Sequence, residues 1–441
     1  MIILILYLLF FFVIGIIDYY RVKNFDDYIV AGRKQKESLV TMSILATVIG
    51  ASATMGIASL AVQYGSTAFL WLGSGGIALI LQSLLLSKKI RSFNAYTLPG
   101  IADITAGKEG KIIISLVIII SWTGIIAAQF VALSSIVALL TGKQTTTIFI
   151  IACSLVVIFY TAFGGQISII RTDAIQLLFV ATGIALALFA LFRGTDININ
   201  QIFTYKSIND VSFVKILHLI FIVGGSYFIG PDIFSRNFTS ESEITAKKAT
   251  FKAGIALLIF SIAVTMTGII TALVNPQAKE NPFIYIIKYM ANPVTGIIIA
   301  LGLLSAIISS TDTCIVTVSA IIEKDIFGKT RLYAARIIVV IVGLLSLLLA
   351  LFKKDILALL TGTYSIFSPG VVFPVFIAIT AKNKHNINKN IWLSAVLTGG
   401  AFGLLSNITG KEYISLIGMA FSVILSILSI YCVKREIAEK Q

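Results

Sequence analysis

Charged side chains are scarce in this chain of 441 residues. Only 12% of the residues are Asp, Glu, Lys or Arg, whereas 58% are hydrophobic. A soluble domain has about 25% charged residues, because these side chains cover its surface. Apolar stretches of about 18 residues or more, enough to cross a bilayer, recur along the whole sequence. The composition excludes a soluble enzyme or binding module and indicates an all-α integral membrane protein.

Cysteine and histidine are rare as well, with three and two residues. The cysteines are odd in number and all lie in apolar stretches, so we expect no disulfide framework and no Cys/His metal site. The sequence also lacks a Gly-x-Ser-x-Gly motif, and the paired serines Ser309 and Ser310 have no plausible base beyond Asp312. We therefore expect the chain not to be an enzyme.

About thirteen apolar stretches are long enough to be transmembrane helices, and the connections between them are short. They cover residues 1–19, 37–62, 67–87, 112–141, 146–163, 173–192, 212–230, 251–273, 293–322, 333–352, 355–380, 391–408 and 412–433. The first stretch follows no basic residue and has no small-residue cleavage site, so we expect a retained helix rather than a signal peptide. We expect no soluble domain at either end.

The charge that is present is mainly positive, with 34 Lys and Arg against 20 Asp and Glu. If the N-terminus lies outside, most of the basic residues fall in loops that face the cytoplasm, including Arg33, Lys34, Lys88, Lys247 and Lys248. This is the positive-inside pattern. It predicts a multi-pass protein of the cell (plasma or inner) membrane with its C-terminus in the cytoplasm. The basic surface thus indicates orientation and weak contact with anionic lipid, and not a nucleic-acid partner.

Polar side chains interrupt the apolar stretch from Gly296 to Ile322. A central Asp such as Asp312 costs roughly 2.5–3.5 kcal/mol on membrane-insertion scales, so something must compensate for it. Ala306, Ser309 and Ser310 are spaced i, i+3 and i+4 and would share one face of a helix. Two hydroxyls and a backbone carbonyl on that face suit a small hard cation. The alternative is that the serines bond to carbonyls one turn earlier.

Two other apolar stretches are unusually weak as helices. Residues Ala46–Gly56 are small and hydroxylated, and Gly224–Pro231 combines three glycines with a proline. Both compositions favour discontinuous helices, which are tolerated at membrane depth only where they are buried in protein or line a wet cavity. Close helix packing is the alternative explanation for the small residues.

The two weak stretches lie five spans apart, which is the pattern of an inverted-repeat transporter with its site between the halves. With the first span counted as helix 0, the broken helices are helix 1 and helix 6. The expected domains are 1–36 (helix 0 and a cytoplasmic loop), 37–192 (first five-helix repeat), 212–380 (second, inverted repeat) and 391–441 (two C-terminal helices and a short tail).

One stretch of the sequence resembles a family signature closely. Tyr160-Thr161-Ala162-Phe163-Gly164-Gly165, followed by Thr172-Asp173-Ala174-Ile175-Gln176, is similar to the Y-T-x-x-G-G…T-D-x-x-Q motif of the sodium:solute symporter family. Supporting matches, in the family's order, are Ala31-Gly32-Arg33, Thr97-Leu98-Pro99, Arg236 with Lys247-Lys248, Ser309-Ser310-Thr311-Asp312-Thr313 and Asp325-Ile326-Phe327. The resemblance implies a LeuT-type 5+5 inverted repeat with discontinuous helices 1 and 6.

The resemblance also implies ion sites. One sodium would lie between the break in helix 1 and helix 8, bound by the carbonyls of Ala46, Ile49 and Ala306 and by the hydroxyls of Ser309 and Ser310. A second sodium would use Asp173, Ser309, Asp312 and Thr313. The alternatives are that Asp173 caps a helix N-terminus and that Asp312 pairs with a cytoplasmic Arg or Lys.

The substrate pocket that the resemblance implies is lined by helices 1, 2, 6 and 10. Its candidate residues are Ser52, Ala53, Gly56, Trp71, Gly225, Ser226, Tyr227, Tyr364 and Ser368. Sugar-transporting relatives use amide side chains on helix 1, where this chain has Val48 and Ala53. A break that exposes helix N-termini suits a carboxylate, so an amino acid or organic acid is favoured over a sugar. Tyr227 and Tyr364 are also compatible with simple packing.

Together these features predict a sodium-coupled symporter that imports a small organic solute by alternating access. The expected partners are Na⁺, a small-molecule solute and membrane lipid, with no nucleic acid and no obligatory protein partner. A proton-coupled symporter that uses Asp312 or Asp173 is the first alternative. A sensory membrane domain on the same scaffold is the second.

Overall fold

The computed structural model describes residues 2–142, 147–195, 197–206, 208–277, 280–381 and 387–438. Over these residues the chain is helical apart from loops and an isolated bridge between Gln35 and Ser240. The all-α prediction is therefore confirmed. The predicted domain ranges include residues 1, 143–146, 278–279 and 439–441, which lie outside the described residues, and the domain bounds stay a prediction.

The helices follow one another with short connections. The first half of the chain contains α1 (Ile2–Tyr19), α2 (Phe25–Val30), η1 (Ala31–Arg33), α3 (Glu37–Val48), η2 (Ser52–Gly56), α4 (Ile57–Tyr64), η3 (Gly65–Ala68), α5 (Phe69–Leu85), α6 (Ser87–Ser92), α7 (Leu98–Thr141), α8 (Thr147–Arg193) and α9 (Ile199–Thr204). The middle contains η4 (Ile208–Asp210), α10 (Phe213–Leu217), η5 (His218–Val223), α11 (Gly224–Phe228), α12 (Pro231–Thr239), α13 (Glu243–Val274), α14 (Pro282–Tyr285) and η6 (Ile286–Met290). The last part contains α15 (Pro293–Ile321), η7 (Ile322–Ile326), α16 (Leu332–Phe352), α17 (Ile356–Phe367), η8 (Ser368–Val372), α18 (Phe373–Ala381), α19 (Lys389–Thr409) and α20 (Glu412–Ala438).

Ten segments of the described chain are long and apolar enough to cross a membrane. Thirteen spans were predicted, and the difference arises where predicted spans shorten or join. The segment α8 contains two predicted spans, which meet at a kink where Gly165 is not helical (φ 57°, ψ −157°). The segment Ser52–Leu85 joins parts of two more across Gly65, which is also not helical (φ 55°, ψ −134°). Near the N-terminus, Leu6–Tyr19 and Glu37–Val48 are shorter apolar helices. The exact helix count and the inverted repeat therefore stay predictions.

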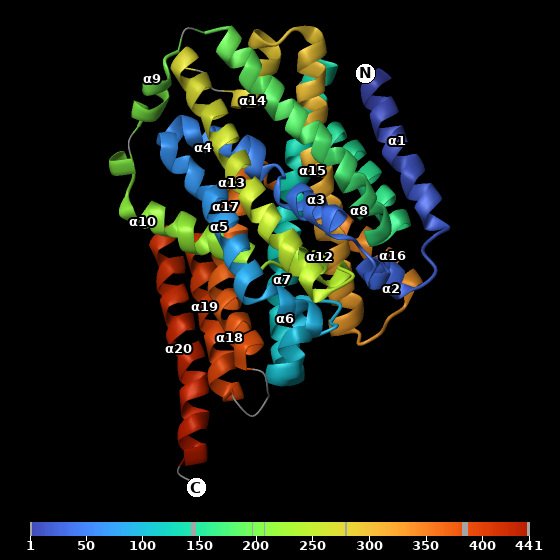
Figure 1. Cartoon of the computed structure of the whole chain (residues 1–441), viewed down its shortest axis with the longest axis vertical. Coiled ribbons are helices and arrows are strands. Elements are labelled where there is room, and N and C mark those ends of the chain that lie inside the picture. Colours follow the sequence, from blue (N-terminus) through green and yellow to red (C-terminus); the bar gives the residue numbers. More distant parts are fainter. Residues whose placement is uncertain are drawn as a thin grey trace.

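Helix α15 forms the centre of the bundle and α20 its edge. In the most apolar part of each span, 78% of the α15 residues are buried against 28% of those of α20. Figure 1 shows α15 behind α3, with α7 and α8 beside it and α1 along the outer side of α8. The helix α1 begins at the top of that view and α20 ends at the bottom. The polar stretch of the sequence thus lies on the most enclosed helix.

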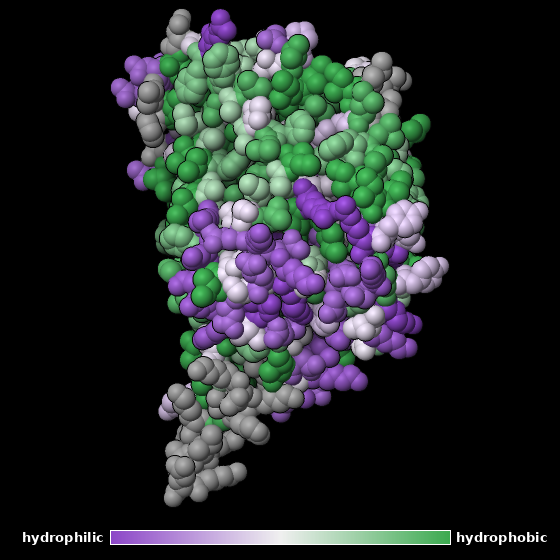
Figure 2. Space-filling model, turned by 45° about the vertical axis from the view of Figure 1, so that its right-hand side comes forward, coloured by the Kyte–Doolittle hydropathy of each residue, from purple (hydrophilic) through white to green (hydrophobic). Residues whose placement is uncertain are grey.

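Large apolar side chains cover the outward faces of the long helices. Ile120 on α7, Leu178 on α8 and Leu348 on α16 are more than half exposed. Figure 2 shows the consequence, a hydrophobic surface above a band of hydrophilic residues. Such a surface is stable only in contact with lipid hydrocarbon, so the helices are membrane spans.

Two helices are broken inside the bundle. Helix α3 ends at Val48, because Ile49 leaves helical geometry at φ −92° and ψ 68°, and the chain turns helical again at Ser52. Helix α11 ends at Phe228, because Ile229 has φ −127° and ψ 78°, and α12 begins at Pro231. Both breaks lie within the stretches that the sequence marks as weak.

Helix α8 bends at Gly165, the second glycine of the signature motif. Its φ of +57° is in the region that favours glycine, and a Cβ there would lie 2.3 Å from the Tyr28 ring. The Tyr28 hydroxyl donates a hydrogen bond to the Ala162 carbonyl at 3.2 Å, so α2 packs into this bend. The glycine therefore serves the fold, since both its backbone and its missing side chain are needed.

We expect Gly165→Ala to lower the melting temperature of the purified protein. The substitution forces alanine into a backbone region that is essentially restricted to glycine (φ 57°, ψ −157°), at a cost of roughly 1–3 kcal/mol, and adds a clash with Tyr28. The matched control is Gly400→Ala on α19, where a Cβ meets no atom within 4 Å. The control should be neutral or slightly stabilising, since alanine favours helix more than glycine does. Equal melting temperatures for the two variants would contradict this account of the bend.

Candidate ion and solute site

The break after α3 leaves backbone carbonyls that need partners. The last four carbonyls of a helix accept no hydrogen bond from within it. Here the N–H of Ile49, just after the helix, donates to the Leu45 carbonyl, which leaves the carbonyls that follow Leu45 in α3 in need of donors. The hydroxyl of Ser309 on α15 donates to the Ala46 carbonyl at 2.9 Å, and that of Ser310 donates to the Thr47 carbonyl at 2.6 Å. Two adjacent serines thus meet two adjacent carbonyls of the broken helix.

These contacts bring most of the predicted first ion site together. The Ser309 hydroxyl also lies 3.1 Å from the Ala306 carbonyl, so oxygens of Ala46, Ala306 and Ser309 are neighbours. All five predicted residues are buried. Thr47 was not predicted, and it supplies the carbonyl that Ser310 contacts; Ile49 forms the break itself. A buried set of hydroxyl and carbonyl oxygens is the ligand type that hard cations prefer.

Gln129 on α7 supports the other side of the break. Its side-chain oxygen accepts a hydrogen bond from the Ala51 N–H at 2.9 Å. A Cβ at Gly50 would lie 2.4 Å from the Ser310 hydroxyl and 2.6 Å from the Gln129 amide nitrogen. Only glycine therefore allows α15 and α7 to approach the break so closely. Sequence reasoning missed Gln129, although an amide within the apolar stretch 112–141 is a usable signal.

The predicted second ion site contains a guanidinium. Arg236 on α12 donates to a carboxylate oxygen of Asp173 on α8 at 3.2 Å and also to the hydroxyl of Thr313 on α15. The Ser43 hydroxyl on α3 donates to the same oxygen of Asp173. All four side chains are buried. The site residues Asp173 and Thr313 are therefore brought together, with Arg236 between them.

Asp312 leaves this cluster with an unbalanced charge. It is fully buried, and its Oδ1 is 3.4 Å from the Thr313 hydroxyl. Within the described part of the chain, one carboxylate oxygen of Asp312 and one of Asp173 have no hydrogen-bond partner. Two carboxylates against one guanidinium amount to one excess negative charge if both acids are ionised. A buried charge of this kind requires a further cation or a proton.

Four predicted substrate residues converge beyond the ion site. Tyr227 on α11 lies beside the side chains of Ser52, Trp71 and Tyr364. The Trp71 and Tyr364 rings meet edge to face with centroids 6.0 Å apart. All four side chains are buried, so a solute reaches them only after helices move apart. The four residues combine aromatic faces with hydroxyl groups and carry no charge themselves, but the carboxylate of Asp232 is close enough to interact electrostatically with both tyrosines.

The other predicted substrate residues have different surroundings. The Ser368 hydroxyl donates to the Ile222 carbonyl at 2.5 Å, and that of Ser226 to the Val223 carbonyl at 2.6 Å. Ala53 is buried in η2, and a Cβ at Gly56 would contact Leu357 on α17.

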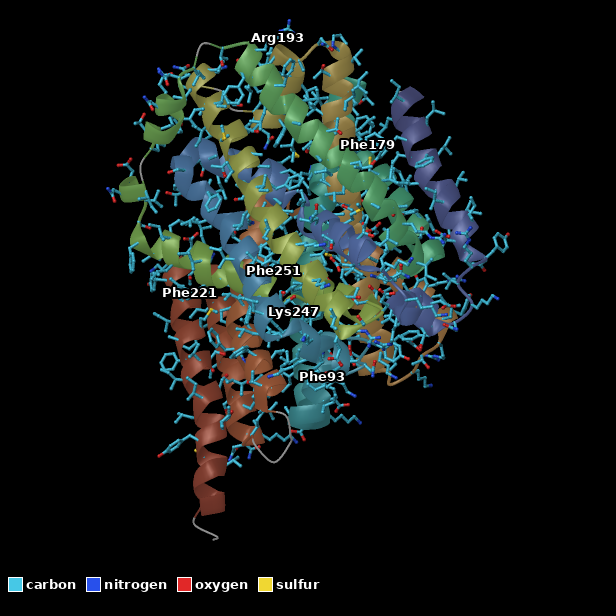
Figure 3. The ribbon with its side chains drawn as sticks, in the orientation of Figure 1. Phe93, Phe179, Arg193, Phe221, Lys247 and Phe251 are labelled. Carbon is cyan, nitrogen blue, oxygen red and sulfur yellow. The ribbon has the colours of Figure 1, made fainter. Side chains whose placement is uncertain are left out.

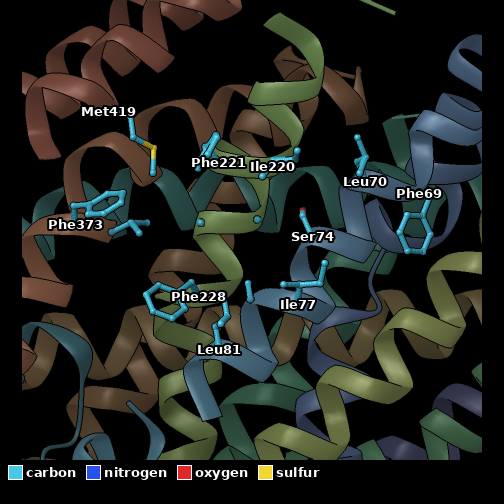
Figure 4. Close-up of a pocket in the computed structure, with 14 residues that line it drawn as sticks. Phe69, Leu70, Ser74, Ile77, Leu81, Ile220, Phe221, Phe228, Phe373 and Met419 are labelled. Atoms are coloured by element: carbon cyan, nitrogen blue, oxygen red, sulfur yellow. The ribbon is translucent and has the colours of Figure 1, made fainter. Parts of the chain in front are cut away.

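Gly225 lines a separate pocket of about 350 Å³ between α5, α11, α18 and α20. Figure 4 shows the apolar side chains around it, including Ile77, Phe221 and Met419.

Tyr96 and Thr97, just before α7, connect the ends of several helices. The Tyr96 hydroxyl donates to Asp26 at 2.6 Å, and the Arg33 guanidinium lies 5.1 Å from its ring centroid. Burial, together with the hydrogen bond to Asp26, raises the pKa of Tyr96 above its ordinary value. Next to it, the Thr97 hydroxyl donates to Asp325 at 2.6 Å. In this conformation the ends of helices from both halves are therefore joined.

Comparison with known proteins agrees with this arrangement. A model of the sodium:solute symporter family matches residues 28–399. This chain belongs to that family. It is 25% identical to the sodium/proline symporter of Escherichia coli (strain K12), with 91% of this chain and 85% of that protein covered. It is 23% identical to the high-affinity proline transporter PutP of Bacillus subtilis (strain 168), with 82% and 84% covered.

Solved structures of transporters share the fold. A Na⁺-coupled sialic acid symporter in a substrate-bound, outward-open state aligns with a TM-score of 0.79 at 18% identity, covering 97% of this chain and 96% of that one. A nucleobase-cation-symport-1 family transporter in a closed conformation aligns at 0.67 and 16% identity, covering 93% and 95%. The family member described here thus has the LeuT-type transporter fold and is a multi-pass membrane protein.

We expect Gln129→Leu to destabilise the protein by about 1–3 kcal/mol, because it leaves the buried Ala51 N–H without an acceptor. The matched control on the same helix is Ser135→Ala, which removes only a bond to the Val131 carbonyl one turn earlier. Melting temperatures in detergent measure both effects. A Gln129→Leu variant as stable as the control would show that the break does not depend on this amide.

Proposed function

We propose that this protein is a sodium-coupled symporter that imports a small organic solute. The observation that carries the proposal is the contact between the broken end of α3 and the paired serines of α15. The relatives named above, which are symporters and a transporter of small solutes, support it. We also propose that the N-terminus lies outside and the C-terminus in the cytoplasm, as the positive-inside pattern predicts.

The chemistry of a serine hydroxyl fits this role. A hydroxyl has one hydrogen and two lone pairs. The Ser309 hydrogen can therefore stay on the Ala306 carbonyl while the oxygen and the Ala46 carbonyl turn to a cation. We propose that sodium binds to the carbonyls of Ala46, Ile49 and Ala306 and the hydroxyls of Ser309 and Ser310. The Thr47 carbonyl is a further candidate ligand because Ser310 contacts it.

Sodium at this position would join α3 to α15. A ligand shifts a conformational equilibrium only by its difference in affinity between the two states. The ion must therefore hold α3 against α15 more strongly in the outward-open state, which then accepts solute. Each sodium that moves through 100 mV supplies roughly 2.3 kcal/mol. This supports a solute gradient on the order of tenfold or more.

For the solute we propose an amino acid or an organic acid. The site would be formed by Ser52, Trp71, Tyr227 and Tyr364, which are neighbours in the bundle. The four residues carry no positive charge, and the carboxylate of Asp232 interacts with both tyrosines. Backbone dipoles at the helix breaks are therefore the natural partners of a solute carboxylate. The proline transport in the names of the relatives is consistent with this class of solute.

We expect the double variant Ser309→Ala with Ser310→Ala to lose sodium-dependent uptake into proteoliposomes by at least about tenfold. The reason is that two of the proposed oxygen ligands disappear, and one lost charge-assisted contact alone is worth about 1.5–3 kcal/mol. The solute is first chosen from a library by its sodium-dependent effect on the melting temperature.

The control for this experiment is Thr311→Val on the same helix. Its hydroxyl donates to the Ile307 carbonyl at 2.6 Å, one turn earlier on its own helix, so its hydrogen is not directed to a carbonyl of α3. Uptake by this variant should stay close to that of the wild type. If the double serine variant also keeps its sodium dependence, the proposed ion site is wrong.

A second cation is supported by the buried charge of Asp312. It is either a second sodium held by Asp173, Ser309, Asp312 and Thr313 or a proton on one of the acids. The unpartnered carboxylate oxygens of Asp312 and Asp173 favour this idea. The guanidinium of Arg236 already neutralises one of the two acids, which makes Asp312 the better carrier.

We expect Asp312→Asn to remove the second cation. If that cation is sodium, the Hill coefficient for sodium falls from about two toward one in uptake measurements. If it is a proton, the variant loses the response of uptake to an inward proton gradient. The control is Asp355→Asn, which keeps the N-terminal cap of α17. Unchanged sodium cooperativity together with an unchanged pH response would contradict a second cation at Asp312.

A further inference from the structure

A basic groove lies outside the proposed transport site, between α3, α5, α6 and α13. It has a volume of about 680 Å³ and is lined by Glu37, Leu84, Lys88, Ile244, Lys247, Lys248, Phe251 and Lys252. We propose that this groove binds the headgroup of an anionic phospholipid, with an acyl chain along its apolar side chains. The binding is independent of the proposed transport function.

The charges of the groove are unbalanced. Lys252 pairs with Glu37 at 2.5 Å. Within the described part of the chain, no carboxylate lies within ion-pair distance of Lys88, Lys247 or Lys248. Three ammonium groups gathered around one cavity repel one another. A phosphate group in the groove removes this repulsion and offers several acceptor oxygens to lysine donors.

Apolar side chains on the same groove favour a lipid over a soluble anion. Leu84 and Ile244 are 54% and 57% exposed, and Phe251 is 38% exposed. Phe251 follows Lys247 by four residues on α13, so both lie on one face of that helix. Figure 3 shows Phe251 and Lys247 one above the other along α13. A soluble anion gains nothing from these exposed side chains, whereas a phospholipid covers them with its acyl chain.

The groove is built on a fixed contact between two helices. The Ser83 hydroxyl on α5 donates to the backbone carbonyl of Lys247 on α13 at 2.8 Å. Lys88 follows on α6, directly after α5. The lysines are therefore held by packed helices rather than by a loop, which lowers the entropy cost of binding an anion between them.

Occupation of the groove affects the broken helix. Glu37 is the first residue of α3, whose other end supplies the Ala46 carbonyl. A lipid phosphate competes with Glu37 for Lys252 and so weakens the ion pair that connects α3 to α13. On the proposed function, anionic lipid would then change the rate of transport through α3. This consequence rests on that function, whereas the lipid site does not.

Native mass spectrometry of the purified full chain tests the site, with phosphatidylglycerol and phosphatidylcholine as the two probes. We expect tight binding of phosphatidylglycerol only. Each lysine near an anionic lipid is worth about 1 kcal/mol. The variant Lys88→Gln, Lys247→Gln, Lys248→Gln should therefore bind it on the order of a hundredfold more weakly. The corresponding triple Lys→Arg variant should keep the binding, since it keeps the charge.

The control removes the same charge elsewhere, with Lys23→Gln, Lys34→Gln and Lys329→Gln, all at exposed positions outside the groove. Its phosphatidylglycerol binding should equal that of the wild type. Equal losses in the two triple Gln variants would overturn the proposal in favour of a diffuse surface potential. Equally tight binding of glycerol phosphate, which has no acyl chain, would overturn it in favour of a soluble anion. The measurement contains neither solute nor a sodium gradient, so its outcome is separate from that of the transport experiments.

Discussion

The structure depends on one constraint, which is that backbone carbonyls inside a membrane protein must find partners. Helix α3 ends at Val48 within the bundle, so no N–H group of the helix itself donates to its last carbonyls. The hydroxyls of Ser309 and Ser310 donate hydrogen bonds to two of these carbonyls, and the side-chain oxygen of Gln129 accepts one from the Ala51 N–H. A break that would otherwise be costly becomes a set of oriented oxygens.

This arrangement links the broken helix to the most buried helix of the fold. The segment containing α15 is central, and its polar side chains reach α3, α8 and α12 through Ser309, Thr313 and the guanidinium of Arg236. The oxygen set and the carboxylate cluster are therefore parts of one buried polar layer. On the proposed function, a cation at either place would change the electrostatic environment of the other.

Part of this could be predicted from the sequence. Hydropathy gave the membrane helices, and glycine-rich or hydroxylated stretches located both breaks, because these features act locally. The proximity of Ala46 to Ser309, 263 residues apart, followed from the family resemblance and is present in the structure. The roles of Asp173, Asp312 and the substrate residues stay predictions.

Other features depend on tertiary packing and were not predictable. Arg236 was noted only as a motif match, because the sequence does not reveal that α12 brings it against Asp173. The amide of Gln129 stands out within its apolar stretch, but the sequence does not reveal that it accepts a hydrogen bond from the Ala51 N–H. Gly225 lines the apolar pocket beside α20, and its predicted place in the substrate site stays a prediction, since composition does not tell which face of a broken helix points inward.

The central claim is that α3 and α15 form one alkali-ion site, and direct binding of radioactive sodium to the purified protein tests it. The account predicts saturable binding that unlabelled sodium displaces and potassium does not, and that is lost when α15 carries alanine at both serines. Undiminished sodium binding by that protein, or equal displacement by potassium, would contradict it.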